Sequence, residues 1–175
     1  MISLVGNTVR LRALEPADVD LLYAWENDPR VWSVSDTLAP FSRETLRKFI
    51  ENQQYDIYRT RQMRLVVSCV GDDRPVGMID LFDFDPVNLR AAVGVLICDE
   101  RDRRKGYASE ALGLLTDYAS KVLKLHQLHC SVYAGNLASL ELFRSKGFVQ
   151  AGVRADWSRH GDGWRDEILF QKIFF

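Results

Sequence analysis

The sequence predicts an α/β fold in which a mostly antiparallel mixed sheet of about six to seven strands carries helices on both faces. Three consecutive strand-like runs between residues 65 and 98 are joined by short turns, which is typical of antiparallel pairing. A helical repeat follows and leads into another strand at 128–133, so strand, helix and strand form a parallel crossover unit. At 175 residues, the chain is most simply one domain spanning residues 1–175.

The N-terminal segment is predicted to begin with a strand and a helix. Apolar and basic residues alternate from 9 to 14, as they do in a half-buried strand. Pro16 suits the first position of a helix. That helix should end before Pro29, because proline disfavours helical geometry in the preceding residue. Residues 32–40 are expected to form a loop with apolar anchors.

A second helix should begin at Ser42, which is a good N-cap residue, and fade near Tyr58. Phe41 and Leu46 occupy the two positions of a hydrophobic staple at its start. This pattern predicts that the chain enters the helix at a fixed angle.

The antiparallel strands are expected at 65–70, 76–82 and 91–98, with a five-residue connection after the first and a turn at 83–88 after the second. The helix that follows runs from Gly106 to about residue 122, because its apolar residues recur with a period close to 3.6.

The C-terminal part should contain a short helix and a closing pair of strands. Asn136 can cap the helix, and Gly147 stands where left-handed geometry is wanted after it. The strands are expected at 148–153 and 167–174, with a polar, mobile segment at 155–163 between them.

Composition argues against several kinds of partner. Hydrophobic residues make up 47% and charged residues 27%, which is ordinary for a globular domain. The net charge of −1 gives no reason to expect a nucleic-acid partner. No apolar run approaches the length of about 20 residues that spans a bilayer, and the N-terminus does not resemble a signal peptide. We therefore expect a cytoplasmic protein with no membrane partner.

Cysteine and histidine positions give no sign of a disulfide or a metal. Cys69, Cys98 and Cys130 lie in apolar runs without paired spacing, which indicates buried free thiols. His126 and His129 are three residues apart, but a strand is expected to begin between them. They are therefore interpreted as ordinary strand or surface histidines.

The strongest functional signal lies between Val93 and Gly113. An apolar strand passes through the charged loop 99–105, and Gly106 then opens a helix. Free N–H groups and the positive end of the helix dipole both point to the place where a phosphate would lie. The pattern predicts an anion site.

The residues Arg103-Arg104-Lys105-Gly106-Tyr107-Ala108 match a signature of Arg or Gln, two residues, Gly, one residue, and Gly or Ala. Together with the order of elements, this motif resembles the GCN5-related N-acetyltransferase (GNAT) superfamily. Two further parts look like its ribosomal-protein alanine and spermidine acetyltransferase branch: the opening through Asn27-Asp28-Pro29, and Asn136-Leu137-Ala138-Ser139 followed by Lys146-Gly147-Phe148. The resemblance covers about residues 7 to 174.

The resemblance implies acetyl-CoA as co-substrate and no metal. Backbone N–H groups at 103–108 would hold its pyrophosphate, and pantetheine would pair with the exposed edge of the strand ending at Cys98. Close helix packing is the alternative reason for Gly106 and Ala108, and capping is the alternative for Asn136. The implied coenzyme-binding residues are Leu96, Ile97, Cys98, Arg103, Arg104, Lys105, Gly106, Tyr107, Ala108, Ser109, Asn136, Ser139 and Phe143.

The catalytic residues are less clearly marked. Many family members place a tyrosine acid where this chain has Phe143. The thiolate could leave without an acid, since a thiol pKa is about 8.5, or Tyr133 could substitute. The third explanation is a non-catalytic acyl-CoA-binding regulatory module. Asp83 and Asp85 are candidate bases, with turn geometry as the alternative.

The resemblance implies direct attack by a primary amine in a ternary complex, the amine belonging to a small molecule or a protein N-terminus. Spermidine or spermine is an alternative acceptor. Asp83 supports it, whereas Ala92 and either Leu38 or Ala39 replace acidic residues of the polyamine site. A homodimer is consistent with the resemblance. The candidate acceptor-pocket residues, with packing as the alternative, are Trp25, Glu26, Trp32, Asp36 and Asp83.

Overall fold

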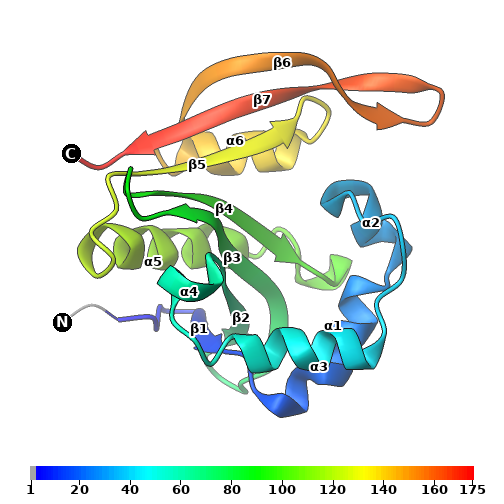
Figure 1. Ribbon diagram of the computed structural model, residues 1–175, viewed down its shortest axis with the longest axis vertical. Coiled ribbons are helices and arrows are strands. Elements are labelled where there is room, and N and C mark those ends of the chain that lie inside the picture. The colour runs from blue at the N-terminus through cyan, green and yellow to red at the C-terminus, as the bar shows by residue number, and fades with distance from the viewer. Residues whose placement is uncertain (1–2) are drawn as a thin grey trace.

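The computed structural model describes residues 3–175. They form one seven-stranded sheet with the strand order β1-β2-β3-β4-β5-β7-β6 (Figure 1). Neighbouring strands are antiparallel except β4 and β5, which are parallel. The strands are β1 (Val9–Ala13), β2 (Met63–Cys69), β3 (Pro75–Asp85), β4 (Arg90–Ile97), β5 (Gln127–Tyr133), β6 (Val149–His160) and β7 (Gly163–Ile173). The predicted α/β fold is confirmed.

Helices cover both faces of this sheet (Figure 1). Helices α5 and α6 pack on one face, and α1 and α3 pack on the other. The helices are α1 (Val19–Glu26, after a 3₁₀ turn at Pro16–Asp18), α2 (Pro29–Ser35), α3 (Arg43–Asn52), α4 (Ile57–Thr60), α5 (Tyr107–Lys121) and α6 (Leu137–Ser145). Within residues 3–175, no helix is long and apolar enough to cross a membrane.

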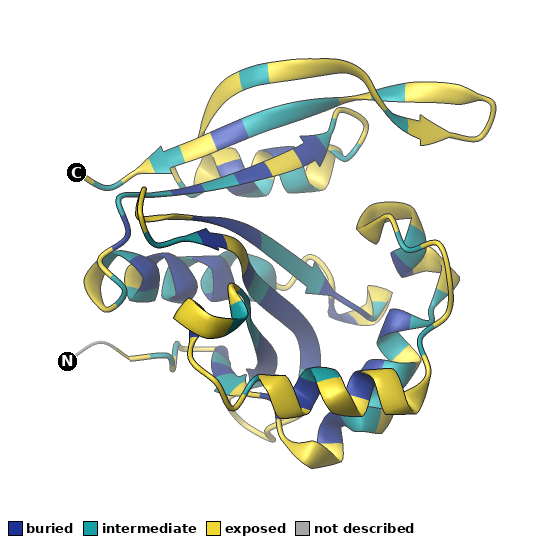
Figure 2. Ribbon diagram, in the orientation of Figure 1, coloured by how far each residue is buried: buried dark blue, intermediate teal, exposed yellow. Residues whose placement is uncertain are grey.

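Two apolar cores hold these layers together (Figure 2). The larger contains Leu112 and Leu115 of α5, which pack against Ile79 of β3 and other buried strand residues. The smaller joins Leu22 of α1 and Leu46 of α3 to the opposite face of β2 and β3. Because strand side chains alternate between faces, each inner strand contributes to one core or the other at successive positions.

The same alternation fixes which residues of β5 face the α1 side. Leu128, Cys130 and Val132 belong to the larger core, on the α5 side. The residues between them, His129 and Ser131, and Tyr133 at the strand end, therefore lie on the opposite face. We call this opposite side of β4, β5 and β7 the acceptor face.

Strands β4 and β5 separate after a short paired stretch. Their parallel pairing covers only Arg90–Ala92 with Gln127–His129. From Val93 to Ile97, β4 pairs with β3 alone. The parallel strand, helix and strand unit is therefore as predicted, and β4 keeps one free backbone edge beside the gap.

Residues 29–60 contain more helix than expected. The segment predicted as a loop at 32–40 begins inside α2, because the Asp28 carboxylate caps that helix and Pro29 is its first residue. The proline that ends α1 thus starts α2. The expected second helix begins as predicted, with the Ser42 hydroxyl accepting from Thr45 N, but ends at Asn52. A separate α4 follows, capped by Asp56.

The prediction of a mobile segment at 155–163 was wrong. These residues extend β6 to His160 and begin β7 at Gly163, forming a long hairpin. Polar residues fill the strand because β6 is exposed along most of its length at the edge of the sheet. Two register shifts, one of them between Arg154 and Ser158, interrupt the alternation from which a strand would be recognised.

Glu110, in the first turn of α5, anchors the chain just before β1. Its carboxylate accepts hydrogen bonds from the backbone N–H groups of Asn7, Thr8 and Val9, each at 2.8 Å, and from the Thr8 hydroxyl at 2.6 Å. Burial opposes its ionisation, but these donors outweigh burial and lower the pKa of Glu110 to about 2.

Glu110→Gln should therefore destabilise the protein by about 1–2 kcal/mol at pH 7, a modest value because the carboxylate is partly exposed. The folded pKa lies below the ordinary 4.5, so the stabilisation is complete above that pH and is lost as pH falls towards 2. Urea unfolding at pH 7, 4 and 2.5 measures it. Asp117→Asn, which alters an exposed ion pair on the same helix, is the control and should cost under about 0.5 kcal/mol. Equal stability of wild type and Glu110→Gln at pH 7 would contradict this account.

Candidate active site

A buried aspartate, Asp102, holds the loop before α5 in place. Asp102 is 4% exposed, and the Arg74 guanidinium donates to both of its oxygens at 2.7 and 2.9 Å. Lys105 lies 3.5 Å from the same carboxylate. Sequence reasoning missed Arg74 and Asp102, because their pairing joins two loops and follows no local spacing. The Lys105 ammonium therefore pairs with Asp102 inside the loop and is not wholly free to bind a ligand.

The residues above this anchor leave positive charge and N–H groups exposed. Gly106 is the N-cap of α5 with φ of 81°, a left-handed conformation that favours glycine. A Cβ at this position would meet no atom within 4 Å. Arg103 and Arg104 are exposed and have no carboxylate within 4 Å among residues 3–175, and Arg103 Nε donates to the Ile97 carbonyl at 3.3 Å. This combination can receive an anion.

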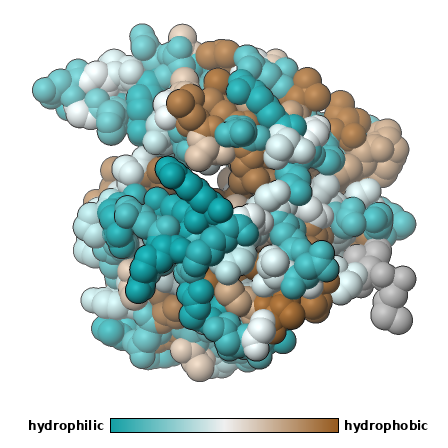
Figure 3. Space-filling view, turned by 180° about the vertical axis from the view of Figure 1, so that it is seen from behind, coloured by the Kyte–Doolittle hydropathy of each residue, from teal (hydrophilic) through white to brown (hydrophobic). Residues whose placement is uncertain are grey.

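The free edge of β4 runs from the apex of the gap towards this loop. Leu96 and Cys98 face the smaller core, and Ile97 faces the larger one. Burial raises the pKa of the Cys98 thiol to about 12, so it stays protonated near neutral pH. Viewed from behind, the surface has a recess with apolar walls between its upper and lower parts (Figure 3).

Helix α6 borders the other side of the gap. Asn136 caps it, with its side-chain oxygen accepting from Ser139 N at 3.2 Å. Phe143 is 4% exposed and packs edge-to-face on Phe148, with ring centroids 5.1 Å apart, and parallel to Phe170. Capping and core packing thus account for Asn136 and Phe143 in this structure, and their coenzyme contacts stay predictions.

A row of side chains crosses the acceptor face where the gap closes. Phe82 of β3 is opposite Ala92 of β4, which is opposite His129 of β5, the last paired residue before the strands separate. Asp83 follows Phe82 with φ of 48°, in an irregular turn of β3. A cavity of about 470 Å³ here is lined by Asp83, Asp85, Arg90, Gln127, His129, Cys130, Ala151, Arg154, Leu169, Phe170 and Gln171.

His129 is one of the cavity residues that sequence reasoning missed as functional candidates. Burial and Arg90 lower its pKa, while the carboxylate of Asp83 acts in the opposite direction. A half-buried, neutral imidazole at the apex can accept a proton near pH 7. Asp85 is engaged in the turn, because its carboxylate accepts from Val87 N, Asn88 N and the Asn88 amide.

The wall formed by α1 is fixed by a buried ion network. Arg64 of β2 donates to both oxygens of Asp80 at 2.8 and 2.7 Å, and also to Glu26 of α1. Burial opposes the charge of Arg64, but Asp80 and Glu26 outweigh burial and raise its pKa. Two of the predicted pocket residues have structural partners. The Glu26 carboxylate pairs with Arg64, and the Trp32 indole donates to the Glu26 carbonyl at 2.7 Å.

The far end of the acceptor face lies between α2 and the β6–β7 hairpin (Figure 1). Tyr133 is half-buried at the end of β5, and the Arg165 guanidinium lies 4.2 Å from its ring centroid. Arg165 also donates to the Ser33 carbonyl of α2 at 3.4 Å. Asp36 is exposed at the C-cap of α2, and Trp25 packs against the smaller core.

Comparison with known families shows to which class of protein this chain belongs. Residues 8–149 match the acetyltransferase (GNAT) domain family. The chain belongs to the GNAT family. It is accordingly an N-acetyltransferase, and the predicted family resemblance is confirmed. The family match ends as β6 begins, so the β6–β7 hairpin with Arg165 lies outside it.

Individual relatives agree with this GNAT assignment. The probable N-acetyltransferase YjcK of Bacillus subtilis (strain 168) is 26% identical over 93% of this chain and 92% of its own. Spermidine N-acetyltransferase of Vibrio cholerae, solved with CoA and spermine, has a TM-score of 0.84 at 21% identity, covering 94% and 95% of the two chains. RimL, a ribosomal L7/L12 alpha-N-protein acetyltransferase, has a TM-score of 0.81 at 19% identity, covering 99% and 93%. The solved structures support the fold.

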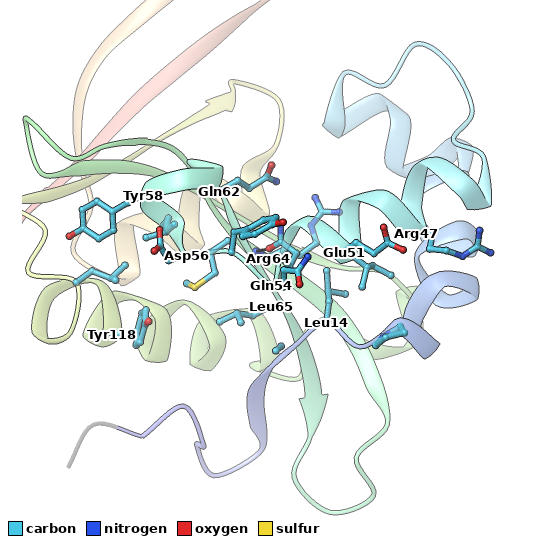
Figure 4. A pocket seen from close by; sticks show the side chains of 18 residues that line it. Leu14, Arg47, Glu51, Gln54, Asp56, Tyr58, Gln62, Arg64, Leu65 and Tyr118 are labelled. Carbon is cyan, nitrogen blue, oxygen red and sulfur yellow. Dashed lines mark hydrogen bonds between the residues drawn. The ribbon is translucent and has the colours of Figure 1, made fainter.

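A second cavity lies away from the GNAT motif residues. It has a volume of about 760 Å³ between α3, α4, the start of β2 and the end of α5 (Figure 4). Tyr58 and Tyr118 line one end, and Arg47 and Glu51 line the other. Arg64 belongs to its wall, but its guanidinium is paired with Asp80 and Glu26.

Proposed function

We propose that this GNAT protein transfers an acetyl group from acetyl-CoA to a primary amine by direct attack in a ternary complex. One observation carries the proposal: the unpaired edge of β4 from Val93 to Ile97 leads to the Gly106 loop at the start of α5. A strand edge binds amide groups, and a helix N-terminus binds phosphate. The two lie in the order in which pantetheine and pyrophosphate occur in the coenzyme.

The residues at these positions fit the coenzyme. Backbone N–H groups from Arg104 to Ser109 would hold the pyrophosphate, since the Arg103 N–H donates to the Glu100 carbonyl, and the side chains of Arg103 and Arg104 would add charge. The open space above Gly106 leaves room for close approach. Leu96, Ile97 and Cys98 would flank the pantetheine from β4, with Ser139 and Asn136 on the α6 side. Acetyl-CoA supplies a thioester that an amine can attack.

The acceptor amine must lose a proton to become a nucleophile. His129 is the base favoured by its place at the apex of the gap; its lowered pKa keeps the imidazole neutral and so able to take a proton, and Asp83 on the same cavity wall can stabilise the charge that then forms. Cys98 stays a thiol, which argues against an acetylated cysteine on the enzyme and for direct attack. With Phe143 buried in the core, the thiolate leaves without an acid from that position; Tyr133 stays the other candidate.

A polyamine acceptor is the second candidate. Asp83 on the cavity wall favours a cationic substrate, as does the likeness to a solved spermidine N-acetyltransferase. Ala92 at the apex and Leu38, which is 96% exposed, bring no charge to the acceptor face. The identity of the acceptor is therefore to be determined by testing a range of amines.

The test is release of free thiol from acetyl-CoA in the presence of amino acids, short peptides, simple alkylamines and spermidine. At least one primary amine should give turnover with equal amounts of acetylated amine and free CoA. Binding of CoA measured by calorimetry without any thiol release from the whole range would overturn the transfer reaction.

His129→Gln tests the assigned base. We expect kcat to fall about 100-fold because proton removal is lost, while the Kd for CoA, measured by calorimetry, is unchanged. His126→Gln is the matched control, since that ring packs on Phe175 outside the cavity. An unchanged kcat for His129→Gln would leave Asp83 or water as the base.

A further inference from the structure

Arg165 is a cation on the acceptor face that has no counter-ion among residues 3–175. Its side chain is half-buried, and its Nε atom is buried with no hydrogen-bond partner. Within the described part of the chain the guanidinium makes one hydrogen bond, the 3.4 Å contact to the Ser33 carbonyl, and it lies over the Tyr133 ring. The remaining N–H groups of the guanidinium are not buried and have no further partner among residues 3–175, so they can pair with a ligand that supplies an acceptor.

The neighbouring carboxylates are already engaged. Glu167 accepts from the Ser158 hydroxyl at 3.0 Å and lies 3.6 Å from Arg154. Asp166 accepts from Asp156 N at 2.8 Å. No carboxylate within residues 3–175 lies within 4 Å of the Arg165 guanidinium, whereas Arg64 and Arg74 are both paired with carboxylates.

The position of Arg165 relates it to the transfer site. Glu167 is opposite Tyr133 in the β5–β7 register, and Arg165, two residues earlier in β7, lies on the same face. His129, at the apex of the gap, precedes Tyr133 by four residues, roughly 13 Å along the strand. An acceptor that carries both an amine and a carboxylate can lie on this face between the His129 and Arg165 side chains.

We propose that Arg165 binds a carboxylate of the acceptor, so that the acceptor is an amine that also carries a carboxylate, such as an amino acid or an acidic dipeptide. The proposal rests on the acetyl transfer proposed above. A guanidinium pairs with a carboxylate through two parallel N–H groups and repels a polycation. Arg165 therefore selects carboxylate-bearing amines over polyamines.

The experiment compares kcat/KM for matched acceptors with and without the charge. β-Alanine is paired with its amide, and a Ser-Asp dipeptide with a Ser-Asn dipeptide, both with an amidated C-terminus so that only the Asp side chain carries a carboxylate; spermidine is added. Wild type should prefer each carboxylate partner by about 10-fold or more. Arg165→Gln should lower kcat/KM for the carboxylate acceptors about 10- to 100-fold through KM, and change the amides by less than about twofold. Arg165→Lys should restore part of the preference.

The controls separate this proposal from the transfer reaction itself. Arg159→Gln, an exposed arginine on the same hairpin, should leave the preference intact. Equal use of carboxylates and amides by wild type, or an equal loss for both in Arg165→Gln, would overturn the role of Arg165. If no acceptor releases thiol, the proposed transfer reaction is overturned. Calorimetry with β-alanine and its amide in the presence of CoA then tests separately whether Arg165 binds the carboxylate. Tighter binding of β-alanine that Arg165→Gln abolishes supports it, and equal binding overturns it.

Discussion

Gly106→Glu is expected to lose acetyl-CoA binding by a factor of about 1000 or more, because like charges brought together cost several kcal/mol. Gly106 caps α5, and the space where its side chain would extend is open. In the proposed complex the coenzyme pyrophosphate fills that space. The glutamate would meet it with both bulk and negative charge, and would also offset the positive end of the helix dipole. Calorimetry with CoA measures the loss.

The hairpin offers a matched control for this variant. Gly161, in the turn between β6 and β7, also has a positive φ, of 59°, and a Cβ there would also meet nothing within 4 Å. Gly161→Glu therefore adds the same charge and a similar backbone strain at a distance from the loop. The two variants should lose similar stability, about 1–2 kcal/mol each, but only Gly106→Glu should lose binding. If Gly106→Glu binds CoA with unchanged affinity, the coenzyme does not bind at the N-terminus of α5.

Local sequence signals predicted the fold well where one residue determines one feature. Ser42 caps α3 and Asn136 caps α6, as expected from their hydroxyl and amide oxygens. The order of strand-like and helix-like hydrophobic patterns along the chain was enough to predict the parallel crossover unit. The same reasoning failed for α2, because Pro29 was interpreted only as the end of one helix and not also as the start of the next. It failed for residues 155–160 because an exposed edge strand needs no apolar alternation.

The candidate site was predictable where it lies within one continuous segment. The Gly106 loop is such a segment, and its exposed N–H groups and arginines are where the motif placed them. The acceptor face and the elements beside it bring together residues from β3, β5, β7 and α2, and their meeting depends on strand register. His129 and Arg165 therefore gave no signal, since neither has a motif and each owes its surroundings to pairing with a distant strand.

The buried network around Arg64 leads to the second large prediction. Arg64, Glu26 and Asp80 have side chains that are 15%, 10% and 17% exposed, so their charges are poorly solvated and depend on one another. The network joins α1 to the sheet beneath the acceptor face. Removing the single cation would leave two buried carboxylates close together.

Arg64→Met should therefore destabilise the protein by about 3–5 kcal/mol, the cost of breaking a buried ion pair by removing one partner. Equilibrium urea unfolding at pH 7 measures it. Arg47→Met is the matched control: its pair with Glu44 is more than half exposed, and its loss should cost about 0.5 kcal/mol or less. A loss as small in Arg64→Met as in Arg47→Met would show that the network is solvated.

A compensating variant separates charge from packing. In the triple variant Glu26→Gln, Arg64→Met and Asp80→Asn, no buried charge is left unpaired, so most of the lost stability should return. If the triple variant is instead as unstable as Arg64→Met, the loss comes from the packing of the Arg64 side chain, whose guanidinium carbon lies 5.0 Å from the Phe49 ring centroid. Because α1 leads directly into α2, the Arg64→Met enzyme should also show a raised KM for its acceptor with an unchanged Kd for CoA, and the triple variant should lower that KM again. A raised KM that stays after stability returns would mean that the Arg64 charge itself acts on the acceptor, and not only through the position of α1.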